Sequence, residues 1–176
     1  MKLDIACGQR KQDGYTGIDI AGDPDIVHDL NEYPWPIDTD TVEEAFCSHY
    51  VEHIPMTLPD GRDGLIAFMT ELHRVCQDGA MVRIIHPYCK SERAFWDPTH
   101  RRFIAVVTWS YFNRDWRVAQ GLDHYPIDVD FEVVNVGANG IPDDVACRDE
   151  ETKMRLLARE WDVIADLDVI LKVRKT

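Results

Sequence analysis

The chain has 176 residues, 45% of them hydrophobic and 29% charged, with a formal net charge of -13. Such a chain can bury one hydrophobic core, and it lacks the run of about 18 apolar residues that a membrane-spanning helix needs. The acidic balance also disfavours nucleic acid as a partner, because that binding draws its affinity from neutralised phosphates. We therefore predict one globular domain over 1–176 with no membrane segment.

The five cysteines are odd in number and spread along the chain, which favours reduced thiols over a disulfide framework. The first residues enter the strand-like stretch KLDIA directly and leave no room for an export signal. From both observations we expect a cytoplasmic protein.

Short apolar runs at 2–6, 15–20 and 25–28 predict three parallel strands, buried on both faces of a sheet. Only eight residues separate the first two runs, whereas a parallel crossover usually takes about a dozen or more and contains a helix. We therefore expect the early crossover helices to be one turn long or missing.

The second half of the chain predicts a fourth strand at 43–48, a helix at 62–76 that the sequence QDG ends, and a fifth strand at 80–87. Two more strands are expected at 130–136 and 166–173, with an amphipathic helix between them. Its apolar positions are Met154, Leu157 and Trp161. The buried stripe of the earlier helix consists of Leu65, Met69, Leu72 and Cys76. This order of elements indicates an α/β fold with a mainly parallel sheet.

The stretch LDIACGQRKQDGYTGIDI suggests a ligand site, because Gly8 and Asp19 each follow the end of a predicted strand. Ligands of open α/β sheets bind beyond these strand ends, and an acid after the second strand can accept hydrogen bonds from a ribose. The loop lacks the three glycines that grip a pyrophosphate. The pattern therefore favours a nucleoside ligand without a diphosphate.

At these positions the sequence resembles the class I S-adenosylmethionine-dependent methyltransferases, in particular a small branch similar to methyltransferase type 11. LDIACG matches their first motif except for Ala6, where the family has glycine. Further matches are HDLNEYPWP, SHYVEHI, ELHRVCQDGAMVRIIHP and FWDPTHRRF, which extend the resemblance over residues 2 to about 103. The resemblance implies a Rossmann-like methyltransferase sheet with an antiparallel C-terminal strand.

The resemblance also implies S-adenosylmethionine as cofactor and gives roles to single residues. Asp19 would bind the ribose hydroxyls, Asp29 and the backbone of Leu30 the adenine, and Gly8 would let the backbone approach. The residues assigned to the cofactor are Asp4, Ala6, Cys7, Gly8, Arg10, Asp19, Ile20, Asp29, Leu30, Ser48 and His49. Turn capping is the structural alternative for the two aspartates. Arg10 or Lys11 could pair with the cofactor carboxylate, although a solvated loop charge is the interpretation we favour.

Three histidines are candidates for a catalytic base, in the order His49, His100 and His86. A structural hydrogen-bonding role is an equal alternative for each. A zinc site from Cys47, His49 and His53 lacks a fourth ligand at a recognised spacing, so we predict no metal. The aromatic residues of 96–116 are expected to belong more to the core than to a ligand site.

These observations predict an enzyme that moves a methyl group from S-adenosylmethionine to an oxygen or nitrogen, with a small molecule as the acceptor. Nicotinamide-dependent reduction ranks low because its phosphate loop is missing. The second hypothesis is a non-catalytic module that binds S-adenosylmethionine or a nucleoside and acts through a protein partner. A homodimer is a further expectation without a specific motif behind it.

Overall fold

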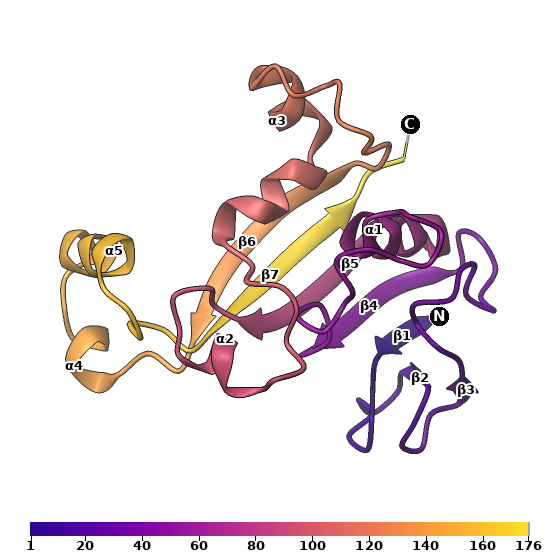
Figure 1. The fold of residues 1–176 in the computed structure, drawn as a ribbon, viewed down its shortest axis with the longest axis horizontal. Helices are drawn as coiled ribbons and strands as arrows, with labels where there is room; N and C mark the ends of the chain where they lie inside the picture. The colour runs from indigo at the N-terminus through magenta and orange to yellow at the C-terminus, as the bar shows by residue number, and fades with distance from the viewer. Residues whose placement is uncertain (176) are drawn as a thin grey trace.

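The computed structural model describes residues 1–175, which form one seven-stranded sheet in the order β3-β2-β1-β4-β5-β7-β6 (Figure 1). The first five strands pair in parallel, β7 pairs antiparallel to β5, and β6 pairs antiparallel to β7. The strands are β1 (Lys2–Ile5), β2 (Thr16–Asp19), β3 (Ile26–Val27), β4 (Val42–Ser48), β5 (Cys76–Pro87), β6 (Phe131–Asn139) and β7 (Asp166–Val173). The predicted α/β sheet, mainly parallel with an antiparallel C-terminal strand, is confirmed.

The connections between β1, β2 and β3 contain no helix in the described chain, as the short spacings predicted. Side-chain contacts brace these loops instead. Asp25 accepts hydrogen bonds from the Gly17 backbone N–H at 2.7 Å and from Lys11 Nζ at 2.8 Å. The Lys11 charge and this backbone bond hold the pKa of Asp25 below its usual range. A polar brace thus replaces the helix that usually connects such strands.

Helix α1 (Gly64–Val75) packs its predicted stripe of Leu65, Met69, Leu72 and the following Cys76 into the core. Asp63 caps it by accepting from the backbone N–H groups of Leu65 and Ile66 at 2.9 and 3.0 Å. The prediction that QDG ends this helix was wrong. The helix ends at Val75, and QDG lies inside β5, which starts four residues earlier than the predicted 80.

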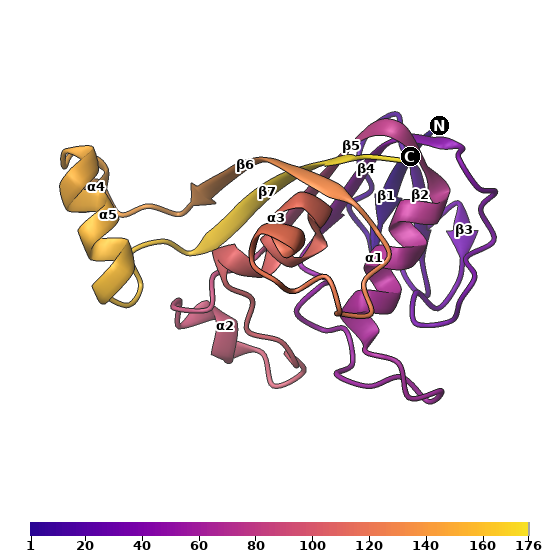
Figure 2. The ribbon, with the colours of Figure 1, turned by 90° about the horizontal axis from the view of Figure 1, so that it is seen from above.

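All helices near the sheet centre lie on one of its faces (Figure 2). These helices are α1, the 3-10 helix η1 (Val106–Phe112), the short α2 (Arg93–Trp96) and α3 (Arg114–Ala119). On the other face, β4 and β5 carry Glu44, Phe46, Met81 and Arg83, while Ala45, Val82 and Ile84 are buried beneath. The expectation that the first three strands are buried on both faces fails at Val27, which is 74% exposed. Val27 lies on the outermost strand, and no crossover helix covers it.

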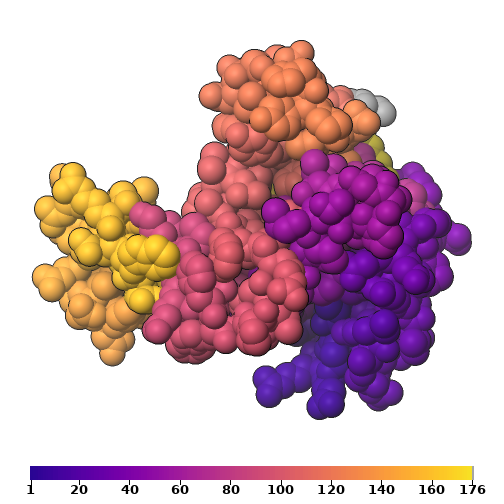
Figure 3. Space-filling model, in the orientation of Figure 1, coloured from indigo at the N-terminus to yellow at the C-terminus, as the bar shows by residue number. Residues whose placement is uncertain are grey.

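The β6–β7 hairpin carries α4 (Asp143–Ala146) and α5 (Glu150–Arg159) at its far end, away from the rest of the molecule (Figure 1). Figure 3 shows them as a separate lobe with a hollow beside it. The predicted amphipathic helix is present, but it ends before Trp161, and Met154 is 64% exposed. Its apolar positions therefore do not all face the core. Across residues 1–175, we find no helix long and apolar enough to cross a membrane.

Candidate functional site

The ends of β1 and β2 bring Gly8 and Asp19 into contact. The Gly8 backbone N–H donates to Asp19 Oδ2 at 2.8 Å, and the Ala21 N–H donates to Asp19 Oδ1 at 3.1 Å. A carboxylate has about four acceptor positions, so roughly two remain for an outside donor. The geometry combines the turn-capping role with the capacity to accept from two hydroxyls.

The loop after β1 turns through left-handed backbone at two positions. Ala6 has φ of 56° and Gly8 has φ of 52°. Only glycine adopts this region without penalty, and another residue pays about 1–2 kcal/mol there. Ala6 therefore stores strain at the position where the methyltransferase motif has glycine, and strained residues gather at functional sites.

The loop after β2 lies directly on this turn. A Cβ atom at Gly22 would stand 2.2 Å from the Gly8 carbonyl oxygen, and Gly22 has φ of 89°. The Asp23 N–H donates to the same oxygen at 3.3 Å. Glycine at 22 is therefore required for the two strand-end loops to meet.

Asp4 and Cys7 are buried below the loop and shape it. Asp4 Oδ2 accepts from the Gln12 backbone N–H at 2.7 Å, and burial raises the pKa of Asp4. The Cys7 thiol lies against Gly17, where an added Cβ would be 2.6 Å from Sγ. Burial likewise raises the pKa of Cys7. These two residues hold the loop in place rather than present groups to solvent.

The two basic residues of the loop after β1 differ in whether an acidic side chain already pairs with them. Arg10 is exposed, whereas Lys11 is already paired with Asp25. Ile20, directly after the acid of β2, exposes 63% of its surface. A planar ring of a ligand could pack against this exposed apolar side chain.

Asp29 follows β3 and caps its own turn: Oδ1 accepts from the Asn31 backbone N–H at 2.9 Å and from Asn31 Nδ2 at 3.1 Å. The neighbouring Leu30 is buried, and its carbonyl oxygen accepts from Trp35 Nε1 at 3.2 Å. Tyr50 reaches this loop from the end of β4, donating its hydroxyl proton to Asn31 Oδ1 at 3.4 Å. Sequence reasoning missed Tyr50, although it stands inside the SHYVEHI motif.

His49 occupies the end of β4, directly after Ser48, whose partner across the ladder is Ile85. Its φ of 54° is left-handed, and its backbone N–H donates to the Ile85 carbonyl at 2.8 Å. The ring Nδ1 lies 3.2 Å from Glu52 Oε1, and Nε2 lies 3.9 Å from Asp166 Oδ2. The hydrogen bond to Glu52, supported by the charges of both acids, raises the pKa of His49. This is a half-exposed imidazole oriented by a buried carboxylate.

His86 is fully buried at the end of β5, and both of its ring nitrogens are engaged. Its Nδ1–H donates to the Pro87 carbonyl at 2.9 Å, while its Nε2 accepts from Trp109 Nε1 at 3.2 Å. Burial lowers its pKa. With both ring nitrogens engaged and no exposed surface, His86 fits the structural hydrogen-bonding role better than that of a catalytic base.

His100 lies beside His53, with ring centroids 4.7 Å apart. The stretch that carries His100 is fixed to the β4 end, because the backbone N–H groups of Arg101 and Arg102 donate to the Glu52 carbonyl at 2.7 and 3.0 Å. The Arg102 side chain donates to the carbonyls of Ile54 and Pro55 at 3.0 and 2.6 Å. The Glu52 carboxylate is thus hydrogen-bonded to His49 and also lies near the ring nitrogens of His53 and His100.

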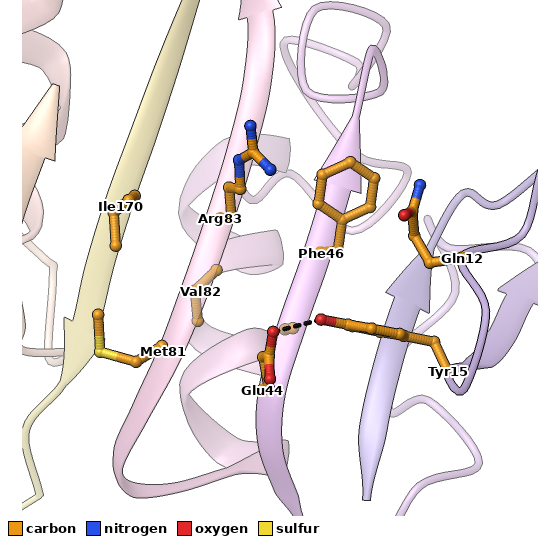
Figure 4. Close-up of a pocket in the computed structure, with 9 residues that line it drawn as sticks. Gln12, Tyr15, Glu44, Phe46, Met81, Val82, Arg83 and Ile170 are labelled. Atoms are coloured by element: carbon orange, nitrogen blue, oxygen red, sulfur yellow. Dashed lines mark hydrogen bonds between the residues drawn. The ribbon is translucent and has the colours of Figure 1, made fainter. Parts of the chain in front are cut away.

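Two hollows of the described surface lie away from these strand ends. Figure 4 shows one of about 280 Å³ on the helix-free face, with Phe46, Arg83 and a Tyr15–Glu44 hydrogen bond at its wall. An apolar one of about 370 Å³ lies between α5 and β7, with Tyr88 and Leu167 in its lining. The aromatic group of 96–116 divides: Trp109 and Phe112 are core residues, whereas Trp96 and Phe103 are 67% and 51% exposed.

No protein-family model matches the chain, and no curated protein matches it in sequence. Solved structures do match in fold. A SAM-dependent methyltransferase from Archaeoglobus fulgidus is 19% identical with a TM-score of 0.59, over 97% of this chain and 85% of that one. The complex of the Haloferax volcanii Trm112 methyltransferase activator with a candidate methyltransferase matches at 12% identity and a TM-score of 0.57, over 99% and 82%.

The protein therefore has the α/β Rossmann-like fold of the S-adenosylmethionine-dependent methyltransferases. The same fold also appears in the [4+2]-cyclase SpnF, at 11% identity and a TM-score of 0.54, over 99% of this chain and 74% of that one. One fold carries more than one reaction, so the reaction has to be argued from the site.

Proposed function

We propose that this protein is an S-adenosylmethionine-dependent methyltransferase that methylates an oxygen or nitrogen atom of a small molecule. The observation that carries the proposal is the contact between Gly8 and Asp19 at one sheet edge, with the His49–Glu52 pair at the same edge. The parallel register of β1 with both β2 and β4 puts these loops side by side.

The residues at the strand ends fit the nucleoside part of the cofactor. Asp19 keeps acceptor capacity for two ribose hydroxyls, and the exposed Ile20 beside it would pack against the adenine. Asp29 and Leu30 stand at the end of the next strand, where the adenine edge would lie. Arg10, exposed and close to the turn, is the candidate partner of the cofactor carboxylate.

When bound, S-adenosylmethionine supplies a methyl group on a positively charged sulfur. His49 would take the proton that the acceptor loses as its oxygen or nitrogen bonds to the methyl carbon and the carbon–sulfur bond breaks. Glu52 holds the ring by its Nδ1, and Glu52 and Asp166 together stabilise the resulting imidazolium. The rest of the rate gain comes from positioning the two reactants.

Transfer of an isotopically labelled methyl group from S-adenosylmethionine to a panel of hydroxy and amino metabolites tests this proposal. Label should appear in at least one acceptor with the wild-type protein. If the protein binds the cofactor but labels no compound of a broad panel, the result contradicts the methyltransferase proposal and supports a non-catalytic binding module.

That second hypothesis, a non-catalytic binding module that acts through a protein partner, is favoured by the helix-free face of the sheet. One structural neighbour is a complex between an activator and a methyltransferase-fold protein. Co-purification of a partner whose binding depends on S-adenosylmethionine, together with absent methyl transfer, would support it. The cytoplasmic location and the homodimer stay predictions.

A further inference from the structure

Glu52, His53 and His100 form a cluster of which the proposed methyl transfer uses only Glu52, as the partner of His49. One carboxylate oxygen of Glu52 and one ring nitrogen of each histidine lie within 4.8 Å of one another. Glu52 is 2% exposed, and both histidines are half-buried. Two of these residues are adjacent in the chain, and the third comes from the stretch that the Glu52 backbone holds in place.

The hydrogen bonds of the two imidazoles leave one nitrogen of each free to bind a ligand. The Ala94 carbonyl only accepts, so His100 Nδ1 must carry the proton of that 2.8 Å bond. Thr99 donates its hydroxyl proton to Asp97 at 2.7 Å, so its oxygen accepts from His53 Nδ1–H at 2.9 Å. Both rings therefore present an Nε2 lone pair when neutral.

This arrangement is the one that metal-binding histidines use. A ligating imidazole almost always donates its other N–H to a carbonyl or carboxylate, which fixes the tautomer and the ring orientation. Here Ala94 supplies the carbonyl for His100, and Thr99 relays to the Asp97 carboxylate for His53. The Thr99 hydrogen bonds hold the pKa of Asp97 below its usual range, so Asp97 serves as an anion.

Glu52 adds an independent sign of a missing partner. Its Oε1 is bonded to His49, but its Oε2 is buried without a hydrogen-bond partner among the residues that the structure describes. A buried, unpaired carboxylate oxygen is costly unless something compensates it. A cation at this position would supply the compensation.

We propose that Glu52, His53 and His100 bind one divalent ion of the zinc class. Two imidazoles and one carboxylate are a common zinc ligand set, and they leave a fourth tetrahedral position for water or another oxygen ligand. Tetrahedral zinc needs ligand atoms about 3.3 Å apart, from bonds of about 2.0–2.1 Å. The ligand atoms, which lie within 4.8 Å of one another, have to close by up to about 1.5 Å. The site does not depend on the methyl-transfer proposal.

The test is titration of the untagged chain of residues 1–176 with Zn²⁺ by calorimetry, in the wild type and in a Cys147→Ser background, because Cys147 is an exposed thiol. We expect one ion per chain, a higher melting temperature with zinc, and visible absorption bands of tetrahedral Co²⁺ on substitution with cobalt. His53→Asn and His100→Asn should weaken binding by roughly 100-fold. The matched control His124→Asn changes an exposed histidine outside the cluster and should bind as the wild type does.

The variant Thr99→Val is a second test, in case the histidine variants fail to fold. It keeps all three ligands, changes an exposed residue and removes only the relay to Asp97, so binding should weaken by about tenfold. The proposal is overturned if the wild type binds neither Zn²⁺ nor Co²⁺, or if folded His53→Asn and His100→Asn keep the wild-type affinity.

Discussion

Asp19 and Glu52 both lie near the carboxyl ends of the parallel strands, but they differ in burial and in how many of their oxygens have hydrogen-bond partners. Asp19 is half-exposed, and both of its oxygens accept from backbone N–H groups of the two strand-end loops, Gly8 and Ala21. Glu52 is buried, with one oxygen bonded to His49 and the other without a partner in the described chain. The fold fixes the Asp19 carboxylate and leaves it acceptor capacity for neutral hydroxyl groups. The buried Glu52 carboxylate needs a positive charge beside it.

The difference teaches where each group can act. A carboxylate that already accepts from two N–H groups is held rigidly and suits hydroxyl recognition. A buried carboxylate beside imidazoles changes their proton affinity and attracts cations. These differences support the proposed roles, cofactor recognition for Asp19 and proton and metal chemistry for the surroundings of Glu52.

The largest expected effect is on turnover at the Glu52 side. His49→Asn should lower kcat by about 10²–10⁴-fold, the usual contribution of a general base, while S-adenosylmethionine affinity stays within a few-fold. Asn is the suitable replacement because it tolerates the left-handed backbone of position 49. Steady-state kinetics with the labelled cofactor measure both quantities, and unchanged kcat would remove His49 from catalysis.

The next effect is on binding at the Asp19 side. Asp19→Ala should weaken S-adenosylmethionine binding by roughly 10–100-fold, because hydrogen bonds to a charged group contribute about 1.5–3 kcal/mol. The control Asp13→Ala removes an exposed acid from the loop between β1 and β2 and should bind normally. If Asp19→Ala and Asp13→Ala bind S-adenosylmethionine equally well, Asp19 has no role in cofactor recognition.

A smaller effect is expected from the strained turn next to Gly8. Ala6→Gly should raise the free energy of unfolding by about 0.5–1 kcal/mol, since relief of the left-handed strain exceeds the entropy cost of glycine. The matched change Ala45→Gly, in a buried strand position, should destabilise instead. Denaturant unfolding of both variants decides the matter, and a loss of stability in Ala6→Gly would contradict the strain.

The smallest effect is a pH dependence of stability. The pKa of His49 is raised in the folded state, so its bond to Glu52 stabilises fully below the unfolded value of about 6.5 and is lost as pH rises through the folded value. Glu52→Gln should flatten this part of the stability curve. Unfolding measured between about pH 6 and 8 in both proteins tests it; identical slopes would be the contrary outcome.

Much of the fold could be predicted from local patterns. The parallel strands, the missing early helices and the stripe of α1 follow from short apolar runs, short gaps and helical spacing. The start of β5 could not, because Gln77 and Asp78 look like a helix end, and the strand begins before them through the pairing of Cys76 with the distant Val42. Nor could the exposure of Val27, which depends on the absence of a covering helix.

The site divides in the same way. The position of Gly8, Asp19 and Asp29 at strand ends could be predicted because strand ends and turn residues are visible in the sequence; their part in cofactor binding stays a prediction. The cluster around Glu52 was missed: His53 was considered for zinc with Cys47, which is a fully buried core residue. Its structural partner His100 lies 47 residues further along the chain and is brought back by backbone bonds of Arg101 and Arg102.

Calorimetric titration of the wild-type protein with S-adenosylmethionine, its demethylated product S-adenosylhomocysteine and NAD tests the central claim most directly. We predict that the two sulfur nucleosides bind with one site per chain and that NAD does not bind. Binding of NAD, or no heat with either sulfur nucleoside, would contradict the account.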